Sequence, residues 1–344
     1  MKKLTLSTQL LIKRNPIEAF FMLAIIICFG TLFPAIYLVP RDNTPGQILG
    51  FYLGKVGVFS PVISAIIITR IIQRVGIRVS LTSRLKVLLP MWLIALVICM
   101  ADMKLTAPPD VPLTGLILLS LPVSFLPAWV ISCAFSGTAS VRSMLATLVR
   151  PKGKIIYYLV ALLTFPIIHI AGTIITNLMD GRALFPMVSR GTNLSYTIFV
   201  TFFSVLLFSG GLNEESGWRG FAQKRLQARY NPLAAIVILW FLMVVWHIPN
   251  DLIQYQNGGY FMIRIVTYLF ITVLFSWIYN RTGGSILAIA IFHASMNSMN
   301  PLMGVFPITA IGNILLIGFA LIVIVVDSMW HKLPKDHPAV FSDN

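Results

Sequence analysis

The chain has 344 residues, of which 57% are apolar and 11% are charged, and its mean hydropathy is +0.86. A soluble globular protein cannot bury so large an apolar fraction. The composition therefore predicts an all-α, polytopic membrane protein, and it excludes a disulfide-built secreted domain, a disordered tail and a coiled coil. The formal charge of +15 then bears on membrane topology, and we expect no nucleic-acid partner.

Ten apolar runs follow one another along the chain, and each predicts a membrane-spanning helix, since a span needs about 20 apolar residues. They lie near residues 19–40, 56–73, 87–101, 113–136, 155–176, 196–213, 232–249, 261–279, 284–300 and 305–326. The polar stretch between the last two runs is weak, so we expect eight to ten spans. No repeat of fixed period and no soluble domain fits between the runs, which predicts one membrane domain.

The positive charges indicate how these spans are oriented, because Lys and Arg concentrate in cytoplasmic loops. With the N-terminus inside, the outer segments hold six of the 26 Lys and Arg residues, which leaves 20 for the inner side. The outer six are Arg41, Lys55, Lys104, Arg182, Arg190 and Arg264. This bias predicts that both termini lie in the cytoplasm.

Two of the three glutamates in the chain, Glu214 and Glu215, are adjacent and follow an apolar run. A charged group at membrane depth costs about 2.5–3.5 kcal/mol on insertion scales, so a sequence that places one there usually gains a function from it. Glu215 and Arg219 are four residues apart and predict an ion pair on one helix face. Glu214 points about 100° away from that face. A charged helix end at the inner surface would explain this segment equally well.

Two later segments add polar groups at helical spacing. His247 closes a strongly apolar run, and His293 and Asn297 share one helical face because they are four residues apart. A lone histidine inside a membrane more often forms a hydrogen bond between helices than it catalyses a reaction. A His–Asn pair beside a second histidine and an unpaired glutamate instead indicates a polar site.

The depth of these groups depends on where the sixth span ends. If it ended at Leu212, Glu214 and His247 would lie too far apart to cooperate. If the helix continues to an interface near Lys224, a rise of about 1.5 Å per residue puts Glu214 roughly 16 Å deep, His247 roughly 21 Å and His293 roughly 14 Å. The three groups would then converge in a core about 30 Å thick. We expect them to line a polar cavity that opens toward the cytoplasm.

The region 195–305 resembles the CPBP family of intramembrane proteases, which includes CAAX-processing enzymes and bacteriocin-processing or self-immunity proteins. The first motif of that family is two glutamates followed after three residues by an arginine. Glu214, Glu215 and Arg219 match it, and the glycine that often follows the arginine is Gly220.

The other two motifs each contain a histidine. The third, a histidine followed after three residues by asparagine or aspartate, is matched by His293 and Asn297. The second, a phenylalanine followed after three residues by a histidine, is matched at His247, but Met243 stands in place of the phenylalanine. Each motif alone is weak, whereas three in this order are a specific signal.

The resemblance implies hydrolysis of a peptide bond inside the membrane. A scissile amide needs an activated water, donors to the developing oxyanion and an acid for the leaving amine. Glu214 is then the base that activates the water, with the help of His247, and His293 and Asn297 donate to the oxyanion. Glu215 and Arg219 support the site as a neutralised pair.

The resemblance leaves metal dependence open, since the family has been described both as metalloproteases and as glutamate-type hydrolases. Glu214, His247 and His293 could form a three-ligand zinc site with one open position. The His-Glu-x-x-His spacing of other zinc proteases is absent, so we expect that no tightly bound metal is required.

The resemblance also implies a domain division, a location and partners. We expect residues 1–154 to be N-terminal helices of unassigned role, 155–305 the catalytic membrane core, and 306–344 the last helix and a cytoplasmic tail. The protein would be a multi-pass protein of the plasma membrane, in a bacterial cell. Its partners would be the bilayer and a membrane-embedded or lipid-anchored peptide or protein substrate.

Two alternatives come from other functional classes. A membrane scaffold or bacteriocin self-immunity protein would keep the fold and bind partners without cleaving them. A proton-coupled secondary transporter would use buried Glu and His as a proton relay. The transporter predicts inverted repeats, which the sequence does not show, and it gives no reason for the His–Asn pair.

Overall fold

The computed structural model describes residues 6–40, 44–72, 80–106, 111–136, 138–182, 193–254, 258–299 and 309–341. Within these ranges the chain forms helices and turns, without strands. The helices are α1 (Leu6–Arg14), α2 (Pro16–Tyr37), α3 (Thr44–Val58), α4 (Ser60–Ile72), α5 (Leu81–Thr106), α6 (Leu113–Ser136), α7 (Ala139–Val149), α8 (Ile155–Met179), α9 (Leu194–Phe208), α10 (Gly211–Gly217), the π-helix η1 (Trp218–Gln223), α11 (Lys224–Arg229), α12 (Pro232–Gln254), α13 (Gly258–Arg281), α14 (Ile286–Ser298) and α16 (Ala310–Val326).

Where the structure describes them, the ten apolar runs lie almost entirely on these helices, so the predicted all-α membrane fold is confirmed. Residues 305–308, the start of the last run, lie outside the described residues. Seven helices in the described ranges are long and apolar enough to cross a membrane. Helices α3 and α4 meet at a bend of 51° and would count as an eighth span together. The last two predicted runs correspond to the shorter apolar helices α14 and α16, which accounts for the higher count of ten.

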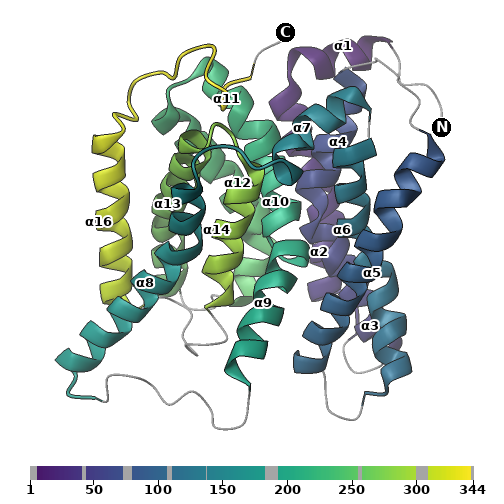
Figure 1. Cartoon of the computed structure of the whole chain (residues 1–344), viewed down its shortest axis with the longest axis horizontal. Helices are drawn as coiled ribbons and strands as arrows, with labels where there is room; N and C mark the ends of the chain where they lie inside the picture. Colours follow the sequence, from purple (N-terminus) through teal and green to yellow (C-terminus); the bar gives the residue numbers. More distant parts are fainter. Residues whose placement is uncertain are drawn as a thin grey trace.

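Two short helices, α1 and α7, were not predicted. They have 9 and 11 residues, and a helix of that length gives no apolar window of membrane-spanning size. Figure 1 shows both at the upper end of the molecule, where they lie beside the ends of the long helices.

The long helices form two groups, with the segment α9–α11 between them. Helices α2 to α6 occupy one side in Figure 1, and α8, α13, α14 and α16 occupy the other. Helix α10, which carries both glutamates, packs against α4 of the first group and α14 of the second. The polar segment therefore lies at the junction of the two groups.

Three close contacts join α3 and α4 to the helices that carry the motifs. The side-chain amide of Asn213 donates a hydrogen bond to the carbonyl of Val58 at 2.8 Å, and the indole of Trp246 donates to the hydroxyl of Ser60 at 2.8 Å. A Cβ on Gly217 would lie 2.6 Å from the carbonyl carbon of Pro61. The bend between α3 and α4 thus supports α10 directly.

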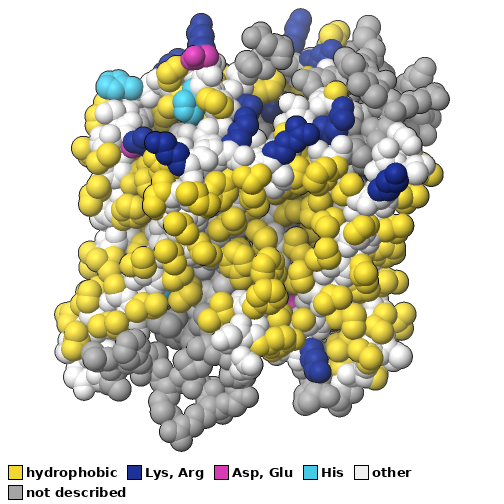
Figure 2. Space-filling model, in the orientation of Figure 1, with side chains coloured by type: hydrophobic (Ala, Val, Ile, Leu, Met, Phe, Trp, Pro, Cys, Tyr) yellow, Lys and Arg dark blue, Asp and Glu magenta, His cyan; other side chains and the backbone are white. Residues whose placement is uncertain are grey.

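The outer surface has the pattern expected of a protein that spans a bilayer. Figure 2 shows a broad belt of apolar side chains around the middle of this face and a concentration of Lys and Arg at the upper end. Helix α1 and the C-terminal residues 327–341 both lie at that end in Figure 1. The side of the membrane that this Lys- and Arg-rich end faces remains a prediction.

Candidate active site

The helix that bears the Glu-Glu pair continues well past it. Residues Ser195–Arg229 form one span of 35 residues, as the depth argument required. The backbone changes twice along it. Gly210 has a φ of +133° between α9 and α10, and residues 218–223 form the π-helix η1. Such π-segments occur mostly as local insertions in helices, often at functional sites.

Gly210 allows His293 to approach the backbone of this helix. A Cβ at Gly210 would lie 2.2 Å from Nε2 of His293, so any other residue would collide with the imidazole. The positive φ also favours glycine. The Gly210 amide donates to Oδ1 of Asn213 at 2.9 Å, which fixes the start of α10. Glycine at position 210 therefore allows α14 to pack directly against the turn that precedes the two glutamates.

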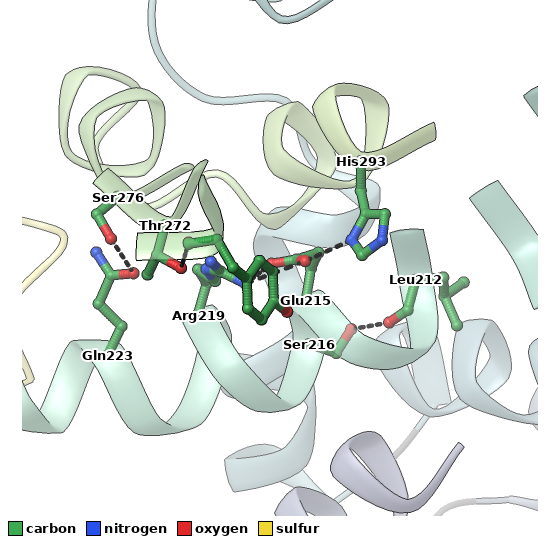
Figure 3. Close-up of polar contacts among 9 residues, drawn as sticks. Leu212, Glu215, Ser216, Arg219, Gln223, Thr272, Ser276 and His293 are labelled. Atoms are coloured by element: carbon green, nitrogen blue, oxygen red, sulfur yellow. Dashed lines mark hydrogen bonds and ion pairs between the residues drawn. The ribbon is translucent and has the colours of Figure 1, made fainter. Parts of the chain in front are cut away.

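Glu215 is the centre of a buried ionic cluster (Figure 3). Nη1 of Arg219 donates to both carboxylate oxygens of Glu215, at 2.9 and 3.1 Å, which confirms the predicted ion pair. His293 Nδ1 donates to Oε1 of the same carboxylate at 2.7 Å. The Arg219 guanidinium also lies 4.6 Å from the centroid of the Phe275 ring. Glu215 and Arg219 are almost fully buried, at 0% and 1% exposure, so the cluster is shielded from solvent.

Glu214 faces a cavity instead of this cluster. It is 6% exposed, and its Oε2 has no hydrogen-bond partner among the residues that the structure describes. The cavity has a volume of about 360 Å³. All six residues of the predicted site line it, namely Glu214, Glu215, Arg219, His247, His293 and Asn297. The sequence motifs therefore come together in one place.

His247 is held in one orientation by its own helix. Its Nδ1 lies 2.8 Å from the carbonyl oxygen of Met243, so Nδ1 carries the proton and Nε2 of the neutral ring is an acceptor. The rings of Trp246 and Tyr268 pack edge-on against it, with centroid distances of 4.7 and 5.1 Å. The departure from the family motif at Met243 leaves this arrangement intact, because the bond to His247 uses the backbone carbonyl.

Further residues that the sequence reasoning did not single out also line the cavity, among them Asn250, Asp251, Arg264 and Tyr268. Asp251 is buried at 5% exposure, and the Arg264 guanidinium lies 4.2 Å from the centroid of the Tyr268 ring. For Asp251 and Arg264, the signal that could have found them is a charged residue within a membrane span. Arg264 lies inside α13, although the sequence analysis assigned it to the outer segments.

The residues that line the cavity extend toward one end of the molecule. Asn250 and Asp251 follow His247 toward the end of α12 that lies opposite α11, and Arg264 lies in the first third of α13, at the same end. Since α11 belongs to the Lys- and Arg-rich end in Figure 1, the described lining extends away from that end. The prediction that the site opens toward the cytoplasmic, Lys- and Arg-rich side is not supported by these residues.

The donor set predicted for zinc is not assembled in this arrangement. Within the ranges that the structure covers, no three His, Cys, Asp or Glu side chains are placed to hold a metal ion. The three predicted ligands, Glu214, His247 and His293, do not form such a group. The described residues therefore do not fit a bound metal ion.

Comparison with known proteins identifies the region that contains these motifs. Residues 196–299 match the family described as type II CAAX prenyl endopeptidase Rce1-like. We call this stretch the Rce1-like domain, after the family to which it is similar. All six predicted site residues lie within it, and the resemblance to the CPBP family of intramembrane proteases is thereby confirmed.

A curated relative matches over a similar length. The chain is 29% identical over 117 residues to CAAX prenyl protease 2 of Methanococcus maripaludis. This alignment covers 32% of the chain and 43% of that protein, so the chain matches less than half of the length of its relative. Helices α1–α8 precede the region that matches the family model.

Proposed function

We propose that the chain is an intramembrane endopeptidase that hydrolyses a peptide bond of a membrane-associated protein or peptide. One observation carries this proposal. Inside the Rce1-like domain, a carboxylate oxygen of Glu214 without a described partner shares a cavity with two oriented histidines and an asparagine. A scaffold gains nothing from this costly arrangement of polar groups within a membrane span.

In the proposed mechanism Glu214 and His247 activate a water molecule. Glu214 accepts a proton from the water as it attacks the carbonyl carbon, and the protonated carboxyl group then gives that proton to the leaving amine. His247 accepts a hydrogen bond from the same water through Nε2, because its Nδ1 proton is engaged by Met243. The histidine thus orients the nucleophile while the glutamate moves the proton.

Asn297 and His293 are the proposed donors to the oxyanion. The Asn297 amide can donate without any change of protonation. His293 donates its Nδ1 proton to Glu215, so its Nε2 can donate to an oxyanion only as an imidazolium. The carboxylate of Glu215 would then balance the positive charge of the ring. This gives the Glu215–Arg219 pair a role in holding His293 that the sequence motifs alone did not indicate.

The cavity walls suit an apolar, membrane-borne substrate. Leu32 of α2, Val58 of α3 and Val205 of α9 line the cavity together with the polar groups. An extended peptide with apolar side chains, from a membrane-embedded or lipid-anchored protein, can therefore place its amide near Glu214 without exposing the rest of the segment to polar groups.

The test is a comparison of peptides in membranes from cells that produce either the wild-type protein or the Glu214→Gln variant. A protease predicts that a precursor accumulates and its product disappears in the variant. A scaffold or immunity protein and a proton-coupled transporter predict no such precursor. Identical peptide profiles in the two membranes, with equal amounts of both proteins, would exclude the proposed function.

A further inference from the structure

A second cavity, of about 580 Å³, lies at the Lys- and Arg-rich end of the molecule. Three segments that are distant in sequence line it: Lys152 before α8, Lys224 at the start of α11, and residues of the C-terminal segment that follows α16. The contributors from that last segment are Lys335, Asp336, His337, Pro338 and Val340. None of these residues lines the candidate active site, so the two cavities are distinct.

The segment that carries Lys152 is fixed against the rest of the protein. The Lys152 amide donates to the Tyr158 hydroxyl at 3.0 Å, and that hydroxyl donates to the Lys152 carbonyl at 2.9 Å. The next residue, Gly153, has a φ of +81°, and a Cβ there would lie 2.7 Å from Cα of Thr282. Lys152 therefore projects from backbone that is held on the turn between α13 and α14.

The C-terminal segment is docked on α11 by its backbone. The Phe341 amide donates to the carbonyl of Lys224 at 2.9 Å, and the side chain of Gln227 donates to the carbonyl of Ala339 at 3.0 Å. The guanidinium of Arg225 lies 3.7 Å from the ring centroid of Phe221 and 4.1 Å from that of Phe341. These contacts bring Lys335 and His337 to the side of Lys224.

The charges around this cavity are unbalanced. Three lysines face one carboxylate, that of Asp336, and none of the three forms an ion pair with a carboxylate in the described part of the chain. Lys152, Lys224 and Lys335 all line this one cavity, so like charges are held together here. The electrostatic repulsion between these lysines is unfavourable, and a bound anion would offset it.

His337 adds a hydrogen-bond donor to this site without adding charge. Burial lowers the pKa of His337, so the ring is neutral at pH 7. Its Nδ1 accepts the Ala339 amide at 3.2 Å, which puts the proton on Nε2. The cavity thus combines three ammonium groups with one neutral N–H.

We propose that this cavity binds a phosphate group, either of an anionic lipid headgroup or of free phosphate. Basic pockets between membrane helices on one side of the bilayer take lipid headgroups in this way, and lysine binds phosphate as a point charge. The bound group would join the C-terminal segment to α11. Lys224 follows directly on η1, which carries Arg219. A phosphate bound to Lys224 would therefore also stabilise the position of the span that carries Glu214, Glu215 and Arg219.

The test uses the purified full-length protein in detergent, with thermal unfolding and native mass spectrometry as readouts. The probes are inorganic phosphate, short-chain phosphatidylglycerol and short-chain phosphatidylcholine. A lipid site predicts that phosphatidylglycerol raises the melting temperature and stays bound, whereas phosphatidylcholine does neither. An equal effect of inorganic phosphate would identify free phosphate as the ligand.

The chain offers matched variants for this test. Lys152→Gln and Lys335→Gln each remove an exposed lysine of the cavity, and each should weaken binding about fivefold, as one Lys near a membrane surface contributes. Lys154→Gln and Lys332→Gln change neighbouring exposed lysines that do not line the cavity and should bind like the wild type. The proposal is overturned if neither anion binds the wild-type protein, or if the cavity variants and the controls bind alike. Neither readout depends on proteolysis.

Discussion

Glu214 and Glu215 are adjacent in sequence and have opposite environments. Glu215 accepts hydrogen bonds from Arg219 and His293 and is fully buried. Glu214 faces the cavity, and one of its oxygens has no described partner. A carboxylate with two cationic or N–H neighbours is a structural anchor, while one that faces a cavity can accept a proton from a substrate water. The predictions at this scale separate the two roles.

The first prediction concerns Glu214→Gln. The amide keeps the size of the side chain but removes the basic oxygen, so turnover should fall by at least about a hundredfold, the usual contribution of a positioned base. The melting temperature should stay near that of the wild type. Both are measured on protein in detergent with a model substrate. Glu18→Gln, which changes an exposed glutamate outside the cavity, is the control and should cleave normally.

The second prediction concerns Arg219→Ala. It leaves the buried Glu215 carboxylate with only His293 as a partner, and loss of one member of a buried pair typically costs about 3–5 kcal/mol of stability. Expression and melting temperature should therefore fall together with activity. Arg229→Ala, at the exposed end of α11, is the control and should leave expression, melting temperature and activity unchanged. If Arg219→Ala melts like the wild type, the cluster does not support the fold as described.

The third prediction concerns metals. Because Glu214 and His247 are proposed to activate water without a metal, treatment of the purified protein with 1,10-phenanthroline or EDTA should leave the cleavage rate unchanged. A three-ligand zinc site would instead lose its ion and its activity. A rate that is abolished by the chelator and restored by added zinc would therefore replace the proposed mechanism by a metal-dependent one.

At the residue scale, the local ion pair and the shared cavity could be predicted, but the individual bonds between distant residues could not. The Glu215–Arg219 pair followed from helical spacing, and the predicted site residues do share one cavity. The bond between His293 and Glu215 joins residues 78 positions apart, and only the packing of α14 on α10 produces it. Asp251 and Arg264 were missed because each lies near the end of a span, where the sequence pattern resembles a loop.

At the scale of elements, hydropathy located the helices but not their irregularities. The described parts of the ten apolar runs lie on helices, because a chain that spans lipid must satisfy its backbone groups within helices. The hydropathy pattern did not indicate the bend between α3 and α4 or the π-helix η1. Both depend on which neighbours pack against the helix, which hydropathy along one chain does not encode.

The fourth prediction concerns the turn before α10. Gly210→Ala forces a Cβ to within 2.2 Å of His293 Nε2 and disfavours a φ of +133°, with a backbone strain of about 1–3 kcal/mol. Activity should be lost and the melting temperature should fall. Gly30→Ala is the matched control, because a Cβ at Gly30 meets nothing within 4 Å. Normal cleavage by Gly210→Ala would mean that His293 is not needed at this position.

At the scale of the whole molecule, the Lys and Arg residues separate the two ends. The first described helix, α1, and the C-terminal residues 327–341 share the Lys- and Arg-rich end in Figure 1. A positive end should face the cytoplasm. The described residues that line the cavity extend toward the other end. The orientation of the termini therefore does not determine the side from which a substrate enters the cavity.

The fifth prediction tests this orientation. A cysteine at Lys154 should react with a membrane-impermeant thiol reagent only after the cells are opened, whereas a cysteine at Lys104 should react in intact cells. The three native cysteines, Cys28, Cys99 and Cys133, are buried and give little background. Labelling of the Lys154→Cys variant in intact cells would reverse the assignment of both ends.

The bend between α3 and α4 has a consequence for exchanging parts between relatives. Val58, Ser60 and Pro61 hold α10 and α12 through contacts that the Rce1-like domain cannot make by itself. A chimaera that joins residues 196–299 to the N-terminal half of another protein would lose these anchors unless the foreign half bends at the same depth. A working chimaera should therefore include α3 and α4 from the same protein as residues 196–299, because Val58 and Ser60 lie 155 and 186 residues before their hydrogen-bond partners.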